Sequence, residues 1–137
     1  MDITVTNDQG IVPITVMQLK GKLDGSNYSD LIGQAEKLYQ NGVRNLLLDL
    51  SGLSYMSSAG IVALHTIAML FRGERRVDQE EGWSAYHAVA RDRDSGPQAH
   101  VKLLGLNDQI HKVLDTVGII TFFEYYNDLH QAVASFH

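Results

Sequence analysis

The segment 43–50 contains three consecutive leucines, Leu46, Leu47 and Leu48. Successive side chains of a strand point to opposite faces of a sheet, so consecutive apolar residues need cover on both faces. The segment therefore predicts a central strand in a sheet that is covered on both sides. The rest of the chain must supply that cover.

Two segments that flank this strand have apolar residues at helical spacing. The first spans 26–40, with Ser26 as a good N-cap residue and Asn41-Gly42 as a good helix end. The second spans 58–71 and carries an apolar stripe. Both segments are long enough for ordinary helices of a globular domain.

The remaining apolar segments continue an alternating pattern. Residues 1–23 predict two strands. The later elements are a strand at 100–106, a helix that Asn107 caps and Gly118 ends, a strand at 119–125, and a final helix that Asn127 caps. The order β-β-α-β-α-β-α-β-α predicts an α/β fold: a mixed sheet of four or five strands flanked by four helices.

Composition narrows the class of protein. The chain has 137 residues, which suits one domain, and its 45% hydrophobic content is typical of a folded chain. It has no cysteine, which excludes disulfides and thiolate metal sites, and its net charge of −5 argues against direct nucleic-acid binding. The N-terminal residues lack the features of a signal peptide, and the longest apolar runs are too short to span a bilayer. We expect a cytoplasmic protein with no membrane insertion.

One segment, 72–98, breaks the pattern, because it is charged and poor in aliphatic residues. It is long for a plain connection, so it is either a helix extension with a loop or a disordered insertion. Trp83 and Tyr86 could form a short apolar stripe that packs on the domain or recruits a partner. The sequence predicts one domain over 1–137, in which this insertion is the least ordered part.

Three segments together resemble the STAS domain family, in its anti-sigma-factor antagonist type. They are GKLD at 21–24, LDLSGLSYMSSAGI at 48–61, and VKLLGLN at 101–107 with TVGI at 116–119. The second is the specific one, since it matches a strand, a loop, and a serine-rich turn before a helix. The resemblance implies a STAS fold and a protein that binds an anti-sigma serine kinase and is switched off by phosphorylation.

The resemblance also implies the site residues. It places the phosphorylated serine at Ser58, with Ser57 as a rival acceptor, and the partner-binding surface at Asp24, Ser57, Ser58, Ala59 and Gly60. Many family members have Asp where this chain has Ser57, and Ser or Thr where it has Ala59. No catalytic residue, metal or cofactor is implied.

Physical chemistry supports the same serine independently. A phosphate adds about −1.5 to −2 charges, and a helix N-terminus tolerates an anion. The fold should survive phosphorylation, while a partner docked on the turn would be repelled. We also expect Gly60 to let a partner's backbone approach closely. The simpler interpretation is that Ser57 or Ser58 caps the second helix.

The sequence also allows other functions. One is a cytoplasmic STAS subunit or regulator of a lipid or anion transport system. Another is a small hydrolase or nucleotide-binding enzyme, for which Asp24 with Asp49, or Ser58 with His65 and Asp49, would supply the chemistry. The chain has no P-loop and no G-x-S-x-G motif, so we expect no enzyme. Self-association remains open.

Overall fold

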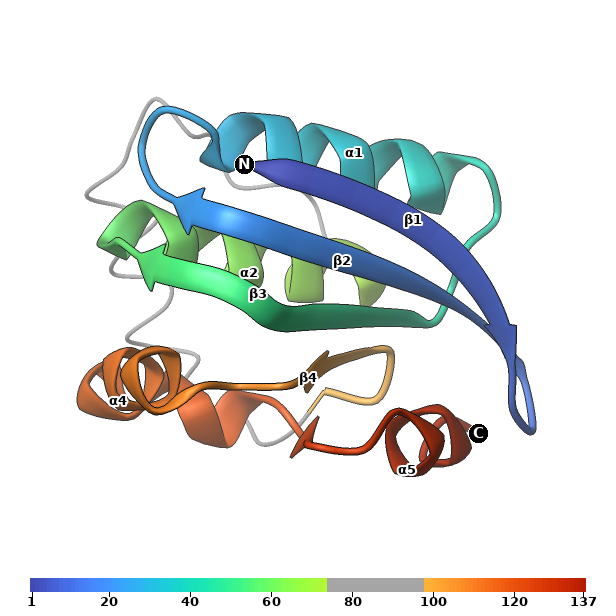
Figure 1. The fold of residues 1–137 in the computed structure, drawn as a ribbon. Coiled ribbons are helices and arrows are strands. Elements are labelled where there is room, and N and C mark those ends of the chain that lie inside the picture. The colour runs from blue at the N-terminus through green and yellow to red at the C-terminus, as the bar shows by residue number, and fades with distance from the viewer. Residues whose placement is uncertain (74–97) are drawn as a thin grey trace.

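Five strands form one mixed sheet in the order β1-β2-β3-β4-β5 (Figure 1). The computed structural model describes residues 1–73 and 98–137. β1 pairs antiparallel with β2, and all other neighbours are parallel. The strands are β1 (Asp2–Gln9), β2 (Pro13–Leu23), β3 (Leu46–Met56), β4 (Val101–Leu104) and β5 (Tyr125–Tyr126).

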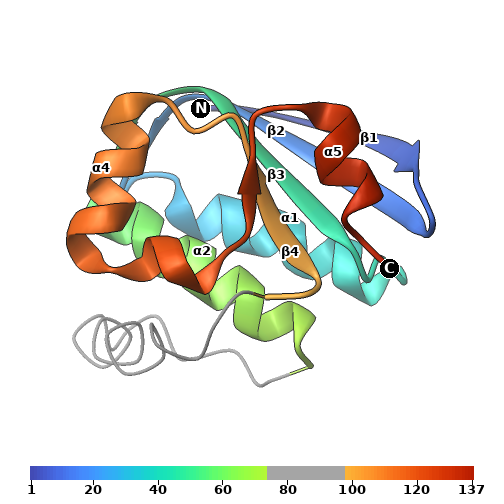
Figure 2. The same ribbon diagram turned by 90° about the horizontal axis from the view of Figure 1, so that it is seen from below.

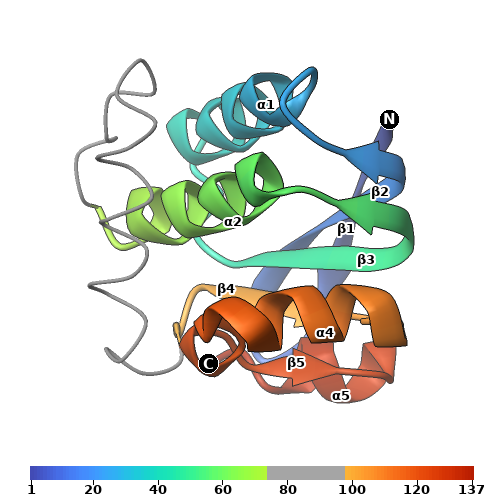
Figure 3. The same ribbon diagram turned by 90° about the vertical axis from the view of Figure 1, so that its left-hand side faces the viewer.

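Four helices within the described residues flank the sheet, which confirms the predicted fold class. They are α1 (Tyr28–Gln40), α2 (Ser58–Phe71), α4 (Asp108–Val117) and α5 (Leu129–Ala134), and a short 3-10 helix spans Ile119–Phe122. Figures 1 and 3 show α1 and α2 side by side along one face of the sheet. α5 packs on the opposite face (Figure 2).

The three leucines of β3 are fully buried, as the sequence predicted for a strand covered on both faces. Leu46 and Leu48 belong to the larger core cluster, which also contains residues of α1, α2 and α4. Leu47 points the other way and packs with Val133 and Phe136, near the C-terminus. The central position of β3 therefore rests on burial of both of its faces.

β3 is longer than predicted, because it continues past Leu50 to Met56. β2 follows it through two register shifts, so that Leu23 ends opposite Met56. Gly52 permits this close pairing, since an added Cβ would lie 2.7 Å from Cγ of Lys20. The extension carries the chain directly to the start of α2.

The predicted start of α1 at Ser26 is wrong. The helix begins at Tyr28 and its N-cap position is Asn27. The backbone N–H and hydroxyl of Ser26 both donate to Oδ1 of Asp24, at 2.9 and 2.5 Å. Ser26 therefore belongs to the preceding turn and cannot cap the helix. The predicted end at Asn41 is confirmed.

The predicted strand at 119–125 is also wrong. Residues Ile119–Phe122 form the 3-10 helix, and only Tyr125–Tyr126 pair with β4. Gly118 ends α4 in the left-handed region, with φ of 87°, and the apolar residues after it are buried as a compact turn. β4 is shorter than its predicted range as well.

Near the C-terminus, the N-cap of α4 is the predicted residue, and the N-cap of α5 lies one position after the predicted residue. Asn107 caps α4 as predicted, because its side chain accepts a hydrogen bond from the N–H of Ile110 at 2.9 Å. The cap of α5 is Asp128 rather than Asn127, with the N–H of His130 donating to Asp128 at 2.7 Å. Asp and Asn are both strong N-cap residues, so sequence alone did not separate the neighbours.

Residues 74–97 lie outside the described residues, and with them lies most of the predicted insertion, including Trp83. The prediction that this segment is the least ordered part of the domain therefore stays a prediction. Among the described residues, every helix is too short or too polar to cross a bilayer.

Candidate functional site

The predicted site residues lie on two neighbouring turns, where β2 and β3 end side by side (Figure 3). The backbone N–H of Ser57 donates to the carbonyl of Leu23 at 2.9 Å. This bond ties the turn that opens α2 to the turn that contains Asp24. We call the surface formed by Asp24 and residues 57–60 the switch end of the molecule.

The two serines of the switch end differ in exposure. Ser58 is the first residue of α2 and is exposed. Ser57 is at the N-cap position, and its Oγ is buried without a hydrogen-bond partner among the described residues. Neither serine caps the helix through its side chain, so the simple capping interpretation is wrong. The hydroxyl that another protein can reach belongs to Ser58.

The start of α2 has a favourable environment for an anion. Its first turn contains no acidic residue. The N–H groups of Ser58, Ala59 and Gly60 have no partner among the described residues, as is usual for the first turn of a helix. These groups carry the positive end of the helix dipole. A phosphate added to Ser58 would therefore be tolerated by the helix.

Asp24 is held in a closed turn at the switch end. Asn27 closes this turn, because its Oδ1 accepts from the N–H of Asp24 at 3.0 Å and its Nδ2 donates to the carbonyl of Lys22 at 2.8 Å. The hydroxyl and then the backbone N–H of Ser26 stabilise the carboxylate and lower the pKa of Asp24. The switch end thus presents a fixed negative charge.

Gly60 is buried, and the structure gives it a role inside the fold. A Cβ on Gly60 would lie 2.6 Å from Cγ of Met56 and 3.0 Å from Cγ of Leu23. The absence of a side chain lets α2 start directly against the ends of β2 and β3. Gly60 therefore sets the position of Ser58, and direct contact of Gly60 with a partner stays a prediction.

The structure does not bring together the carboxylates considered for catalysis. Asp49 lies seven residues before Met56 on β3, about 20 Å from the end where Asp24 lies. Its Oδ1 accepts from the N–H and hydroxyl of Ser51, at 3.0 and 2.7 Å. The described part of the chain contains no group of three residues that could hold a metal ion.

The considered triad does not assemble either. His65 is seven residues along α2 from Ser58, about 10 Å away, and it is buried against the ring of Phe122. A histidine in that position cannot reach the exposed hydroxyl of Ser58.

Sequence reasoning assigned no role to Tyr55, which is 42% exposed, three residues before Ser58. Tyr55 lies on β3 opposite Lys22, within the part of the segment 48–61 that the STAS resemblance predicts as a loop. An aromatic residue between the buried residues Leu53 and Met56 was the available signal. Tyrosines are enriched among the energetically important residues of interfaces, so Tyr55 joins the candidate surface.

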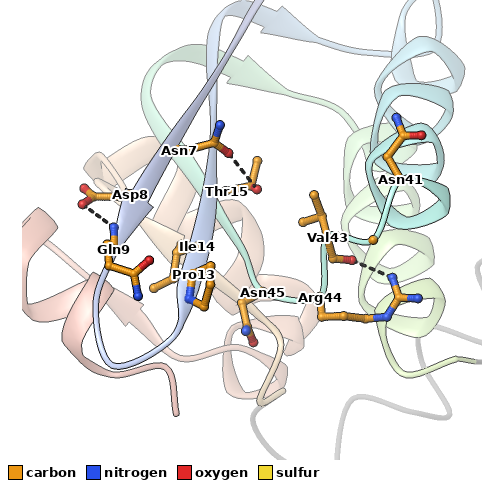
Figure 4. A pocket seen from close by; sticks show the side chains of 11 residues that line it. Asn7, Asp8, Gln9, Pro13, Ile14, Thr15, Asn41, Val43, Arg44 and Asn45 are labelled. Atoms are coloured by element: carbon orange, nitrogen blue, oxygen red, sulfur yellow. Dashed lines mark hydrogen bonds between the residues drawn. The ribbon is translucent and has the colours of Figure 1, made fainter.

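A hollow of about 470 Å³ lies at the opposite end of β2 and β3 (Figure 4). Three asparagines, Asn7, Asn41 and Asn45, contribute to its lining, and we call it the amide groove. In Figure 4 the hydroxyl of Thr15 points toward Asn7, whose Oδ1 it approaches at 3.4 Å. No local sequence pattern predicts this hollow, because its walls come from three separate segments.

Residues 2–76, more than half of the chain, match the STAS domain. The chain belongs to the STAS domain family. No curated protein sequence matches it.

Solved structures with a similar fold include anti-sigma factor antagonists. One from Mycobacterium paratuberculosis is 15% identical, with 98% of this chain and 93% of that chain covered and a TM-score of 0.63. A putative antagonist from Thermotoga maritima is 12% identical, with 87% and 83% covered and a TM-score of 0.64. The antagonist SpoIIAA in its unphosphorylated form is 16% identical, with 96% and 93% covered and a TM-score of 0.53. At these identities the likeness establishes the fold.

Proposed function

We propose that this STAS domain is an anti-sigma-factor antagonist that acts in the cytoplasm. It binds an anti-sigma serine kinase through the switch end, and phosphorylation of Ser58 by that kinase ends the binding. The observation that carries the proposal is the contrast between the two serines: the Ser58 hydroxyl is exposed at the start of α2, and the Ser57 hydroxyl is buried.

The chemistry required is a single phosphoryl transfer. The γ-phosphorus of ATP forms a bond to Oγ of Ser58, its bond to ADP breaks, and the hydroxyl proton passes to a base of the kinase. The turn gains about −1.5 to −2 charges at pH 7. The STAS domain itself supplies only the acceptor and its position.

The added charge has different effects within the domain and at the interface with the kinase. Within the domain, the free N–H groups of α2 stabilise the phosphate, so the fold persists. Across the interface, the kinase meets a new charge in a surface that had fitted an uncharged turn, and desolvating that charge is costly. The partner is released and the domain stays folded.

The neighbouring side chains give the kinase its other contacts. The Asp24 carboxylate, fixed by Ser26, offers a charge for a basic residue of the partner. The exposed ring of Tyr55 offers apolar area with a polar tip. Among similar structures, SpoIIAA was solved in its phosphorylated form as well, at 15% identity and a TM-score of 0.53. The existence of an unphosphorylated and a phosphorylated form of that protein supports the proposal here.

The test is incubation of the purified chain with ATP and the kinase encoded beside its gene, followed by intact mass measurement. We expect a mass increase of one phosphoryl group for the wild type and for Ser57→Ala, and none for Ser58→Ala. Modification of Ser58→Ala but not of Ser57→Ala would move the acceptor to Ser57. An unmodified wild-type chain, which also fails to bind the kinase in calorimetry, would overturn the proposed function.

A further inference from the structure

Oγ of Ser57 is a buried side-chain atom that finds no hydrogen-bond partner in the described part of the chain. Buried hydroxyls are normally hydrogen-bonded, so an unpartnered one calls for a physical reason. The backbone of Ser57, with φ of −87° and ψ of 177°, is the extended conformation typical of an N-cap residue. The backbone of Ser57 is therefore in a capping conformation, and yet its hydroxyl makes no capping bond.

The groups around Ser57 are donors that lack an acceptor. The N–H groups of Ser58, Ala59 and Gly60 are unpartnered among the described residues, and the first turn of α2 has no acidic side chain. The nearby carboxylate of Asp24 already accepts two hydrogen bonds from Ser26 through Oδ1. The start of α2 thus combines a hydroxyl and several N–H groups, which is the complement of an anion with several acceptor oxygens.

We propose that Ser57 is a positioning residue for a phosphoryl group on Ser58: its hydroxyl donates to a phosphoryl oxygen and holds the phosphate over the free N–H groups of α2. The inference rests on the proposed function only in taking Ser58 as the residue that carries the phosphate. A serine changes between staggered rotamers at little cost, so the hydroxyl moves from its buried position to the helix end by rotation about one bond. The phosphate supplies three acceptor oxygens for these donors.

This role depends on a hydroxyl rather than on any capping side chain. A carboxylate at position 57 could accept the N–H bonds of α2 but could not donate to the phosphate, and it would repel the dianion. A threonine keeps the donor. Alanine removes the donor and leaves the N–H groups as the only support.

The first experiment measures the second pKa of the phosphate directly. Phosphoserine is installed at position 58 of the full chain during translation, without any kinase, and its ³¹P chemical shift is followed against pH. Donors favour the dianion and lower the second pKa, whereas the carboxylate of Asp24 raises it in all variants alike. The contribution of the donors is therefore measured as the difference between variants, and the second pKa of the wild type should lie roughly half a unit or more below that of Ser57→Ala. Ser57→Ala should abolish at least half of the lowering of the second pKa, and Ser57→Thr should keep the second pKa of the wild type.

A matched control comes from Ser54, which lies at the same end of β3. Its hydroxyl donates to the carbonyl of Gly21 at 3.2 Å, away from the helix start. Ser54→Ala should leave the second pKa unchanged. Equal values in the wild type and in Ser57→Ala would overturn the proposal.

The second experiment compares melting temperatures in the two phosphorylation states. Without phosphate, Ser57→Ala removes an unpartnered buried hydroxyl, so the melting temperature should stay equal or rise. With phosphoserine at 58, the same substitution should lower it. A residue that merely capped α2 would lower the melting temperature in both states, and that result would refute the positioning role.

These outcomes are separable from those that test the proposed function. Because no kinase takes part, a kinase that fails to modify Ser58 contradicts the antagonist function and leaves both measurements interpretable. The opposite outcome is also possible to recognise. If the kinase modifies Ser58 but Ser57→Ala leaves the second pKa of the phosphate unchanged, the antagonist function stands and the role of Ser57 is refuted.

Discussion

The two ends of β2 and β3 are made from the same pair of strands but lie beside opposite ends of a helix, the start of α2 at one and the end of α1 at the other. At the switch end, Asn27 closes the Asp24 turn with two hydrogen bonds, and Nδ2 of Asn107 donates to the carbonyl of Leu53 at 2.7 Å. At the amide groove, the side-chain contact between Asn7 and Thr15 is long, at 3.4 Å. The same end also has short bonds: the N–H of Thr15 donates to the carbonyl of Asn45 at 3.0 Å, and Nη1 of Arg44 donates to the carbonyl of Tyr39 at 2.7 Å. Both ends are therefore held by hydrogen bonds. They differ in the helix end that they present, which is the start of α2 with the exposed Ser58 at the switch end and the C-terminus of α1 at the amide groove.

The difference indicates where a switch can operate. A phosphate can change the affinity for a partner only if the surface around it keeps its geometry, so rigid turns on packed strands are suitable carriers. The switch end satisfies this because Gly60 locks α2 against Leu23 and Met56. The amide groove has space and polar groups, but it has no exposed hydroxyl on a helix start. Four substitutions test this contrast.

The largest effect is expected from adding one methyl group at the switch end. Gly60→Ala places a Cβ 2.6 Å from Cγ of Met56, and overpacking of this kind costs about 1–3 kcal/mol of unfolding free energy. The matched control is Gly33→Ala in α1, where no atom lies within 4 Å of the added Cβ. Because alanine is the better helix former, the control should gain up to about 1 kcal/mol. Urea unfolding of both variants measures the difference, and equal stabilities would show that the switch end is not tightly packed.

The next effect is on binding. Ser58→Asp places a negative charge where the phosphate would be, and we expect the kinase affinity to fall at least tenfold, about 1.4 kcal/mol. The domain should remain folded, since the start of α2 tolerates an anion. Calorimetric titration gives the affinity and circular dichroism checks the fold. Wild-type affinity in the folded variant would mean that the kinase does not contact this turn.

Other parts of the fold show which features can be predicted from the sequence and which cannot. The three leucines of β3 and the caps at Asn107 and Gly118 were predicted correctly, because each depends on a local pattern. The segment at 119–125 was assigned wrongly, because a short apolar run fits a strand and a buried turn equally well.

The candidate site likewise has features that could be predicted from the sequence and features that could not. The resemblance to the STAS family indicated Ser57 and Ser58 as the candidate acceptors. Which of the two hydroxyls is buried depends on the pairing of Leu23 with Met56 and on the packing of Gly60 against both. Those contacts join segments more than thirty positions apart, and no local pattern reports them. The exposure of Tyr55 was missed for the same reason.

A smaller effect concerns the charge of Asp24. Its pKa is lowered in the folded state by the hydroxyl and N–H of Ser26, so the charged form stabilises the fold above the ordinary aspartate pKa of about 3.9. That contribution is lost as the pH falls through the lowered value, and it is small because the group is exposed to solvent. Asp24→Asn should therefore make stability slightly less sensitive to pH below about 5. Denaturant unfolding from pH 3 to 7 would detect this, and an unaltered pH profile would contradict the assignment.

The smallest effect on binding is expected from the same charge placed at the other end. Asn41→Asp adds one negative charge at the amide groove, as Ser58→Asp does at the switch end. Met56 lies ten positions after Leu46 on β3, a distance of about 30 Å. The screening length at physiological salt is only about 8 Å. We expect the kinase affinity to change less than twofold. The new charge lies at the C-terminus of α1, where it opposes the helix dipole and should cost about 0.3–1 kcal/mol of stability. The variant is therefore predicted to be less stable and yet to bind normally, the reverse of Ser58→Asp. A tenfold loss of affinity in Asn41→Asp would show that the kinase also contacts the amide groove or that it senses the net charge of the domain.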